Sequence, residues 1–226
     1  MPAGGVPGLL KKALVEALLE WHRDNRRDYP WRRCGDPFRV LVAEVMLQRT
    51  RADQVEEVFT RFFEEFPDPS AAASADREKL ERLLAPLGLR HRARRMGRLL
   101  SELLERHGGR IPDDYDELLK LPGVGPYTAS AVLCFAFGRR IPIVDANVAR
   151  FYVRFFGVEP RGRPHRDPEV LRLAEECLPE GRAREYNEAL LDFAALVCGP
   201  TPRCGSCPLR ELCRYARASG GVREPD

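Results

Sequence analysis

The sequence of 226 residues predicts an all-α protein. Apolar residues recur at three- and four-residue spacing in several segments, which is the pattern of amphipathic helices. Segments rich in glycine and proline separate these helices. Sustained alternation of apolar and polar residues, the mark of a strand, is absent except in the short IPIV at 141–144. We therefore expect roughly ten helices and no internal repeats.

The expected helices follow one another along the whole chain. The first is an N-terminal helix over about residues 10–27, and the second lies within PFRVLVAEVMLQRT at 37–50. Leucine, valine and phenylalanine repeats predict further helices at 55–66, 80–87, 99–104 and 184–197. Stretches that break helices are expected at 67–74, 107–114, 160–168 and 178–181.

The composition is that of an ordinary globular protein, with 44% hydrophobic and 31% charged residues. The longest nearly apolar run, Ala129 to Phe137, is too short to cross a bilayer. The N-terminus lacks a charged start followed by an apolar block, so no signal peptide is expected. We expect a soluble, cytoplasmic monomer without a membrane partner, in a compartment that disfavours structural disulfides.

Basic residues gather in two places, although the formal net charge is only +3. The segment RHRARRMGR at 90–98 holds five arginines, and a second group contains Arg161, Arg163, His165 and Arg166. A local basic face can bind phosphates while the molecule stays nearly neutral. A solvated, arginine-rich surface is the alternative interpretation of each cluster.

Four cysteines lie within sixteen residues near the end of the sequence: Cys198, Cys204, Cys207 and Cys213. Four thiolates so close in sequence can surround one centre, which predicts a bound metal species. Structural zinc sites more often use two C-x2-C pairs, whereas this window has one, so a [4Fe–4S] cluster is favoured over zinc or a disulfide pair. Cys34, Cys134 and Cys177 stand alone, and the last two lie on apolar faces that predict core positions.

The stretch LPGVGPYTASAVLCFAFG at 121–138 predicts a tight turn between two helices. A helix from DDYDELLKL is expected to end at Leu121, and Gly123 and Gly125 then lead into a second helix that starts near Tyr127. Exposed amides at Val124, Gly125 and the next helix N-terminus can approach a phosphate closely. A plain corner between two helices is the alternative.

An aspartate, Asp145, follows twenty residues beyond Gly125 in IPIVDANVARFYVRFFG. The hairpin, this aspartate and the cysteine window, in that order, resemble the helix–hairpin–helix (HhH-GPD) DNA glycosylases of the endonuclease III superfamily. The resemblance covers about residues 21–215. One departure is visible, because family members commonly have one more residue between the first two cysteines.

The resemblance implies two helical domains with a DNA cleft between them. Residues 31–139 would form a six-helix barrel that ends in the hairpin, and residues 1–30 with 140–226 would form a discontinuous iron–sulfur cluster domain. The [4Fe–4S] cluster would be structural, and it would shape a loop in which Arg203 and Arg210 meet the DNA backbone.

The resemblance also implies a catalytic set. Asp145, at the domain junction, would stabilise the positive charge that builds on the deoxyribose and orient the attacking water; a helix cap at Ala146 is its structural alternative. Tyr127 stands where bifunctional members carry a lysine, which implies a monofunctional enzyme that leaves the abasic site intact; a packed aromatic is the alternative. Glu44 would protonate or hydrogen-bond the flipped base, unless it lies on an exposed helix edge.

The implied partner is double-stranded DNA that contains a mismatched or damaged base. Gln48 corresponds to the residue that fills the gap left by the extruded nucleotide, and Arg49 stands where adenine-specific members have a second glutamine. Five further residues are expected to contact DNA: Gly123, Val124, Gly125, Thr128 and Asn147.

Two branches of the family fit. The thymine/uracil mismatch glycosylases (the MIG type) are short and share four motifs with this chain: PWR at 30–32, LPGVG-x-YT at 121–128, AFG at 136–138 and VDAN at 144–147. The adenine glycosylases (MutY) usually carry a G-Y-Y motif that GLRHRAR at 88–94 lacks, and a C-terminal domain. We expect excision of thymine or uracil opposite guanine.

Other functions stay open. The enzyme alternatives are excision of adenine opposite guanine or 8-oxoguanine, and excision of hypoxanthine or another lesion. A non-catalytic DNA-binding module and an electron-transfer protein are alternatives of other classes. In a bacterium or archaeon, the DNA partner would associate the protein with the nucleoid.

Overall fold

The computed structural model describes residues 5–88 and 90–218, with the side chains of Arg90 and His91 excepted. Within these residues the regular elements are thirteen α-helices and three short 3-10 helices, and no strand forms, IPIV at 141–144 included. The all-α prediction is confirmed. The expected count of helices was too low, because several helices have only four or five residues and show no periodicity.

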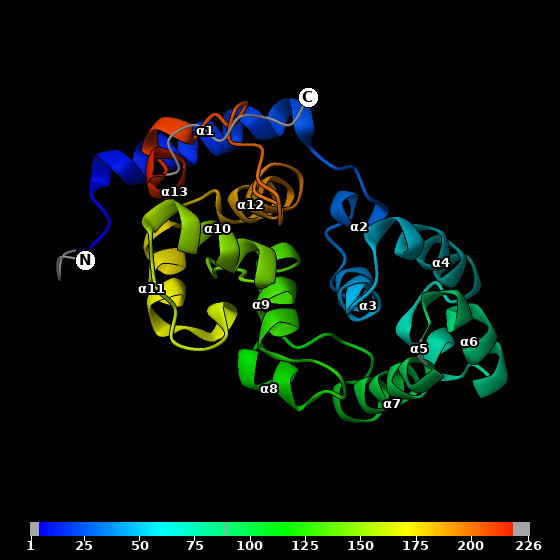
Figure 1. The fold of residues 1–226 in the computed structure, drawn as a ribbon. Coiled ribbons are helices and arrows are strands. Elements are labelled where there is room, and N and C mark those ends of the chain that lie inside the picture. The colour runs from blue at the N-terminus through cyan, green and yellow to red at the C-terminus, as the bar shows by residue number, and fades with distance from the viewer. Residues whose placement is uncertain (1–4, 89, 219–226) are drawn as a thin grey trace. The chain divides into compact units, whose positions relative to one another are not determined.

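The chain divides into two compact units. The first contains the described residues up to Arg27 together with those from Arg140 onward, and the second contains Asp28–Arg139. Figure 1 labels the helices of each.

Eight α-helices build the unit of residues 28–139: α2 (Pro30–Arg33), α3 (Pro37–Leu47), α4 (Ala52–Glu65), α5 (Pro69–Ala73), α6 (Arg77–Leu84), α7 (Arg90–His107), α8 (Tyr115–Lys120) and α9 (Pro126–Phe135), with a 3-10 turn at Ala85–Leu87. Aspartates cap three of them: the side chains of Asp36, Asp68 and Asp114 accept backbone amides of α3, α5 and α8. Helix α3 packs against α9, and α7 against α5 and α6.

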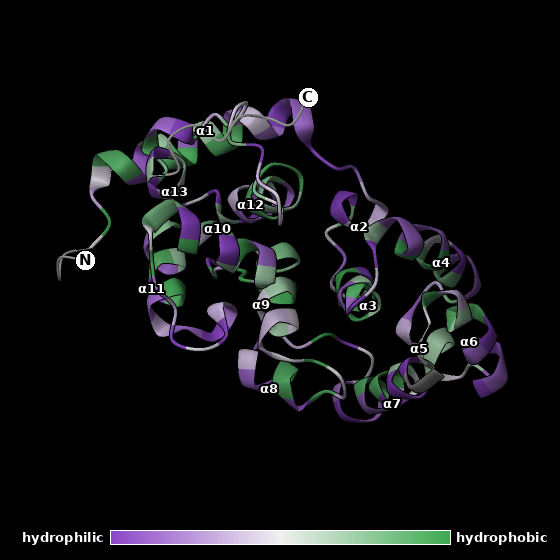
Figure 2. Cartoon of the chain, in the orientation of Figure 1, coloured by the Kyte–Doolittle hydropathy of each residue, from purple (hydrophilic) through white to green (hydrophobic). Residues whose placement is uncertain are grey.

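The core of this unit is aliphatic around α3 and aromatic around α4. Eight of the eleven residues of α3 are buried, namely Phe38 and Val40 to Met46, so this helix is covered on all sides. Helix α4 buries one stripe, with Phe59, Phe62 and Phe63 in edge-to-face or tilted contact. In Figure 2 α4, α6 and α7 each carry both hydrophilic and hydrophobic residues, as amphipathic helices do.

The other unit contains five α-helices: α1 (Gly8–Asn25), α10 (Ala146–Phe156), α11 (Pro168–Cys177), α12 (Ala183–Leu196) and α13 (Arg214–Ala218), with 3-10 turns at Pro164–Arg166 and Arg210–Leu212. Helix α12 packs against both α1 and α10. The hydroxyls of two fully buried tyrosines, Tyr152 and Tyr186, lie 3.2 Å apart, so each polar group has a partner in the core.

A buried carboxylate holds the end of α1 to α12. Asp192 is fully buried; it accepts hydrogen bonds from Nε of Arg27 at 2.6 Å and from the Arg27 amide at 3.1 Å, and His22 Nε2 lies 3.2 Å from its Oδ2. A buried charge is tolerated when it is paired and hydrogen-bonded in this way. The contacts therefore explain how the Asp192 carboxylate is accommodated between α1 and α12.

Helix boundaries differ from the expected ones by a few residues, because the ends of a helix are its least sharply defined part. The first helix spans Gly8–Asn25 and the second hairpin helix begins at Pro126. The stretch 67–74, expected to separate two helices, itself contains α5, because Asp68 caps an alanine-rich turn. Cys134 and Cys177 are fully buried, which confirms their predicted core positions.

Among the described residues, no helix combines the length and apolar character needed to cross a membrane.

Candidate active site

The turn between α8 and α9 needs glycine at one position. Gly123 has φ of +86°, and a Cβ there would lie 2.3 Å from Cδ of Arg95, whose side chain covers the turn. The amide of Val124 donates to the carbonyl of Leu121 at 3.1 Å, so it has a partner inside the turn, and its contact with a DNA phosphate stays a prediction. Thr128, in the first turn of α9, is buried.

A second turn, Gln48–Thr50, leads from α3 to α4 and is joined to the hairpin. Gln48 Nε2 donates to the Gly123 carbonyl at 2.8 Å and lies 3.4 Å from Thr128 Oγ1. Gln48 is half-buried, whereas Arg49 is exposed. Arg49 is the one non-glycine residue with positive φ, +58°, in the described chain. The two segments expected to meet DNA in this unit are thus tied together by one side chain.

Glu44 and Tyr127 lie on α3 and α9, two helices that pack against each other. The Glu44 side chain is buried, with 5% of its surface exposed, so an exposed helix edge is the wrong interpretation of this residue. Tyr127 is half-buried in the first turn of α9. An ionisable group buried in an apolar helix is costly unless it is paired or used, which keeps Glu44 a catalytic candidate.

Asp145 caps α10, and both of its carboxylate oxygens accept hydrogen bonds. Oδ1 accepts from the Val148 amide at 2.7 Å, and Oδ2 accepts from Nδ2 of Asn147 at 3.1 Å. The cap at Ala146 is therefore confirmed as one role of this residue. The carboxylate is half-buried and fixed in orientation, which is what a preorganised charge requires.

Arg150, a residue that the sequence did not single out, continues this arrangement. Its Nη2 donates to Oδ1 of Asn147 at 2.8 Å, and its Nε donates to the Cys198 carbonyl at 3.1 Å. An unbroken series of hydrogen bonds therefore joins Asp145 to the first cysteine of the window. The spacing of Asn147 and Arg150 within α10 could have suggested the first contact. Nothing in the sequence indicates the contact with Cys198.

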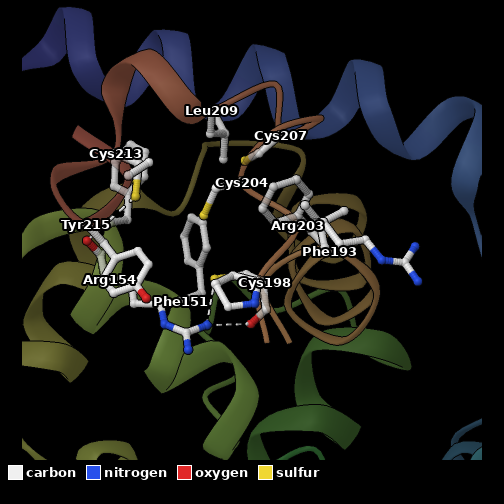
Figure 3. Close-up of a pocket in the computed structure, with 14 residues that line it drawn as sticks. Phe151, Arg154, Phe193, Cys198, Arg203, Cys204, Cys207, Leu209, Cys213 and Tyr215 are labelled. Carbon is white, nitrogen blue, oxygen red and sulfur yellow. Dashed lines mark hydrogen bonds between the residues drawn. The ribbon is translucent and has the colours of Figure 1, made fainter. Parts of the chain in front are cut away.

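All four cysteines of the window line one pocket, which Figure 3 shows with its neighbours. Phe151, Phe155, Phe193 and Leu209 supply apolar walls. Arg154 supplies a cation: its Nη1 lies 3.7 Å from Sγ of Cys198 and donates to the Gly199 carbonyl at 2.6 Å. Each of the four cysteines is a free thiol of intermediate exposure.

Burial raises the pKa of the Cys198, Cys207 and Cys213 thiols, that of Cys207 to about 11. Arg154 opposes this effect at Cys198. Within the described part of the chain, no three His, Cys, Asp or Glu side chains are gathered so as to hold a single metal ion. The four thiols are grouped around a shared space and not around one point.

The two basic clusters differ in the structure. Arg94 and Arg98 are exposed on α7, and Arg161, Arg163 and Arg166 are exposed in their loop. Arg92 is instead buried, with 5% of its surface exposed, so the arginines of 90–98 do not all belong to a surface.

Comparison with known proteins assigns the family. Residues 42–180 match the model of the HhH-GPD superfamily base excision DNA repair proteins. A thymine/uracil-DNA glycosylase of Pyrobaculum aerophilum is 40% identical over 86% of this chain and 87% of its own length. An adenine DNA glycosylase of Mycobacterium tuberculosis is 38% identical over 89% of this chain and 67% of its own length.

Solved structures agree with this result. A thermostable thymine-DNA glycosylase superposes with a TM-score of 0.85 at 33% identity, over 93% of this chain and 98% of its own. A trapped covalent intermediate of endonuclease III with DNA superposes with a TM-score of 0.79 at 27% identity, over 95% of this chain and 99% of its own.

The chain thus belongs to the HhH-GPD superfamily of base excision DNA repair proteins. Within it, the activity is that of a DNA glycosylase, which confirms the family and the activity class expected from the motifs.

Proposed function

We propose that this glycosylase removes thymine or uracil paired with guanine in double-stranded DNA, by hydrolysis and without cutting the strand. The observation that carries the proposal is the 40% identity with the thymine/uracil-DNA glycosylase of Pyrobaculum aerophilum across 87% of that protein. The tyrosine at position 127, in place of an amine nucleophile, supports the hydrolytic course.

Asp145 carries the central step of the proposed mechanism. As the bond between C1′ and the base nitrogen breaks, its electrons leave with the base and positive charge grows on the sugar. The fixed carboxylate stabilises that charge and accepts a proton from the water whose oxygen bonds to C1′. Hydrogen bonds from Val148 and Asn147 hold both carboxylate oxygens in place, so little reorganisation is needed during the reaction.

Glu44 and Gln48 serve the base and the gap in this proposal. The buried Glu44 carboxyl hydrogen-bonds or protonates the leaving base, which lowers the cost of its departure as an anion. Gln48 and Arg49, with Gly123, Gly125 and the start of α9, contact the duplex around the extruded nucleotide.

The cysteine window holds a structural [4Fe–4S] cluster in the same proposal. The donor set fits: four thiols line one pocket, apolar side chains surround them, and Arg154 lies against Cys198 to offset the negative charge of thiolate ligands. Arg150 and Arg154 together bind the carbonyls of Cys198, Gly199 and Pro200, which shapes the first part of the loop. The bound cluster would fasten this loop and would take no part in the hydrolysis.

Adenine excision is the second candidate, because the Mycobacterium tuberculosis adenine glycosylase is 38% identical. One experiment separates the two: single-turnover base release from duplexes with T:G, U:G, A:G, A opposite 8-oxoguanine and hypoxanthine pairs, followed by alkali. Fastest release from T:G or U:G, with strand breaks only after alkali, is expected. Fastest release of adenine would establish the second candidate, and release from none would leave a DNA-binding module.

A further inference from the structure

We infer that Arg92 is a positioning residue that holds the Gln48–Thr50 turn in the conformation in which this turn enters damaged DNA. The inference rests on the proposed function, because the DNA contact of Gln48 and Arg49 belongs to that proposal. The observations that carry it are the burial of Arg92, its hydrogen bonds to this turn and the strained backbone between them.

Arg92 reaches from α7 beneath the turn and binds two oxygens of the turn and one of the preceding helix α3. Nη1 donates to the Met46 carbonyl at 2.7 Å and to Thr50 Oγ1 at 2.6 Å, and Nη2 donates to the Gln48 carbonyl at 2.6 Å. The planar guanidinium can satisfy several acceptors in fixed directions, which a lysine ammonium on a flexible stem cannot reproduce. Arg92 thus hydrogen-bonds to the turn on both sides of Arg49.

These contacts explain how an arginine stays in a left-handed backbone conformation. Positive φ is unfavourable for a residue with a Cβ, and such strain persists when the surrounding structure over-determines it. The Arg49 side chain is exposed and its φ is +58°, while the carbonyl before it and the hydroxyl after it are both held by Arg92. The result is that the turn presents Arg49 outward.

Burying the charge of Arg92 costs desolvation free energy, which is a high cost for a merely structural contact. The residue is 5% exposed, its hydrogen bonds go to neutral oxygens, and it forms no ion pair within the described chain. Burial, followed by the nearby positive charge of Arg95, lowers the pKa of this arginine. A DNA phosphate at the turn would supply the negative charge that the protein itself does not place there.

The same network reaches the hairpin. Arg95 Nη1 lies 3.4 Å from Gln48 Oε1 and its side chain covers Gly123, while Gln48 Nε2 donates to the Gly123 carbonyl. Helix α7 therefore sets the position of the Gln48–Thr50 turn relative to the hairpin turn. A shift of this turn would therefore weaken binding at the opened part of the duplex and leave binding of intact duplex unchanged.

The test measures preference for a gap in the duplex. We would determine Kd for a duplex with a tetrahydrofuran abasic analogue opposite guanine and for an undamaged duplex of the same sequence. The preference is the Kd for the undamaged duplex divided by the Kd for the abasic duplex. In Arg92→Lys this ratio should fall about tenfold, because a guanidinium bound to several oxygens is replaced by one donor centre. Affinity for the undamaged duplex should stay within about twofold, since nonspecific binding follows charge.

Two further variants make the test specific. Thr50→Val is isosteric and removes one acceptor of Arg92, so the preference should fall about threefold even if Arg92→Lys fails to fold. Arg106→Lys makes the matching substitution at an exposed position of α7 outside the basic segment 90–98 and should leave the preference unchanged.

An unchanged preference in both Arg92→Lys and Thr50→Val would overturn the inference, and so would equal losses on both duplexes. If the protein itself showed no preference for the abasic analogue, the turn would not enter the gap and the inference would fail. A clear preference without release of thymine or uracil would refute only the proposed specificity.

Discussion

The side-chain amide of Asn147 donates a hydrogen bond to the carboxylate of Asp145, with 3.1 Å between Nδ2 and Oδ2. Arg150 binds the other side of the same amide and also the Cys198 carbonyl. A catalytic candidate and a candidate cluster ligand are therefore connected within one unit of the protein.

Asn147→Ala should lower the single-turnover rate of base release about tenfold, because one carboxylate oxygen loses its fixed donor. Arg150→Gln should give a smaller loss, since Asn147 keeps its contact with Asp145. Rates measured at saturating enzyme, together with melting temperatures, check this expectation. A full rate in Asn147→Ala would show that the contact has no catalytic role.

Asp145→Asn should reduce base release at least about a hundredfold, because the charge under the sugar is lost. The cap of α10 should survive, since asparagine caps helices as well as aspartate does. Asp145→Ala should lose about 1 kcal/mol of unfolding free energy in addition. Denaturant unfolding and base release on the same samples separate the two roles, and activity retained in Asp145→Asn would exclude the charge from the mechanism.

Tyr127→Lys should introduce strand cleavage through an imine at the abasic sugar, since a primary amine then stands at the position of the hydroxyl. Reduction with borohydride during the reaction should trap a covalent complex with the variant but not with the unaltered protein. Lys120 is no substitute nucleophile: hydrogen bonding and charge of Glu117, 2.6 Å away, raise its pKa and keep the amine protonated. Trapping that disappeared in Lys120→Gln would refute this.

Gly123→Ala should destabilise the protein by about 1–3 kcal/mol, because alanine is strained at positive φ and its Cβ would collide with Arg95. Gly125→Ala is the matched control: its φ is −106° and a Cβ there meets nothing within 4 Å. The control should keep the stability, measured by urea unfolding. Equal stability of both variants would contradict the strain argument.

Replacing Cys204 or Cys207 by alanine should abolish binding of iron and inorganic sulfide and lower the melting temperature, whereas Cys34→Ser should change neither. Cys34 lies outside the pocket, with its thiol 3.6 Å from the Trp31 carbonyl, so it controls for the loss of a thiol as such. Iron, sulfide and zinc analyses of anaerobically purified protein check the result. Zinc at one equivalent, without iron, would replace the proposed cluster.

The helical class and most of the helices could be predicted because they depend on local pattern. The valine and phenylalanine repeat at 55–66 has the period of an amphipathic helix, and α4 forms there. Helix α5 was not predicted, because its five residues carry no periodicity and depend on the Asp68 cap. Cys134 and Cys177 were predictable as core residues for the same reason, since an apolar face must be covered.

The candidate site was predictable only in part. Motif order indicated Asp145, Gln48 and the cysteine window, because these residues lie in short, distinctive stretches. The contacts of Arg92 with Met46 and Gln48 and of Arg150 with Cys198 were not visible, since each joins residues more than forty positions apart along the chain. Within RHRARRMGR all arginines look alike in sequence, yet Arg92 is buried and Arg94 is exposed.

The sequence by itself determined the all-helical class, the family and the residue types that the chemistry needs, because periodicity and short motifs are properties of local stretches. Only the tertiary structure decided which arginine lies beneath the Gln48–Thr50 turn, that the Val124 amide is used inside its own turn, and that Arg150 links Asn147 to Cys198. Such contacts depend on how helices pack, and packing places residues together by distance in space and not by distance along the chain.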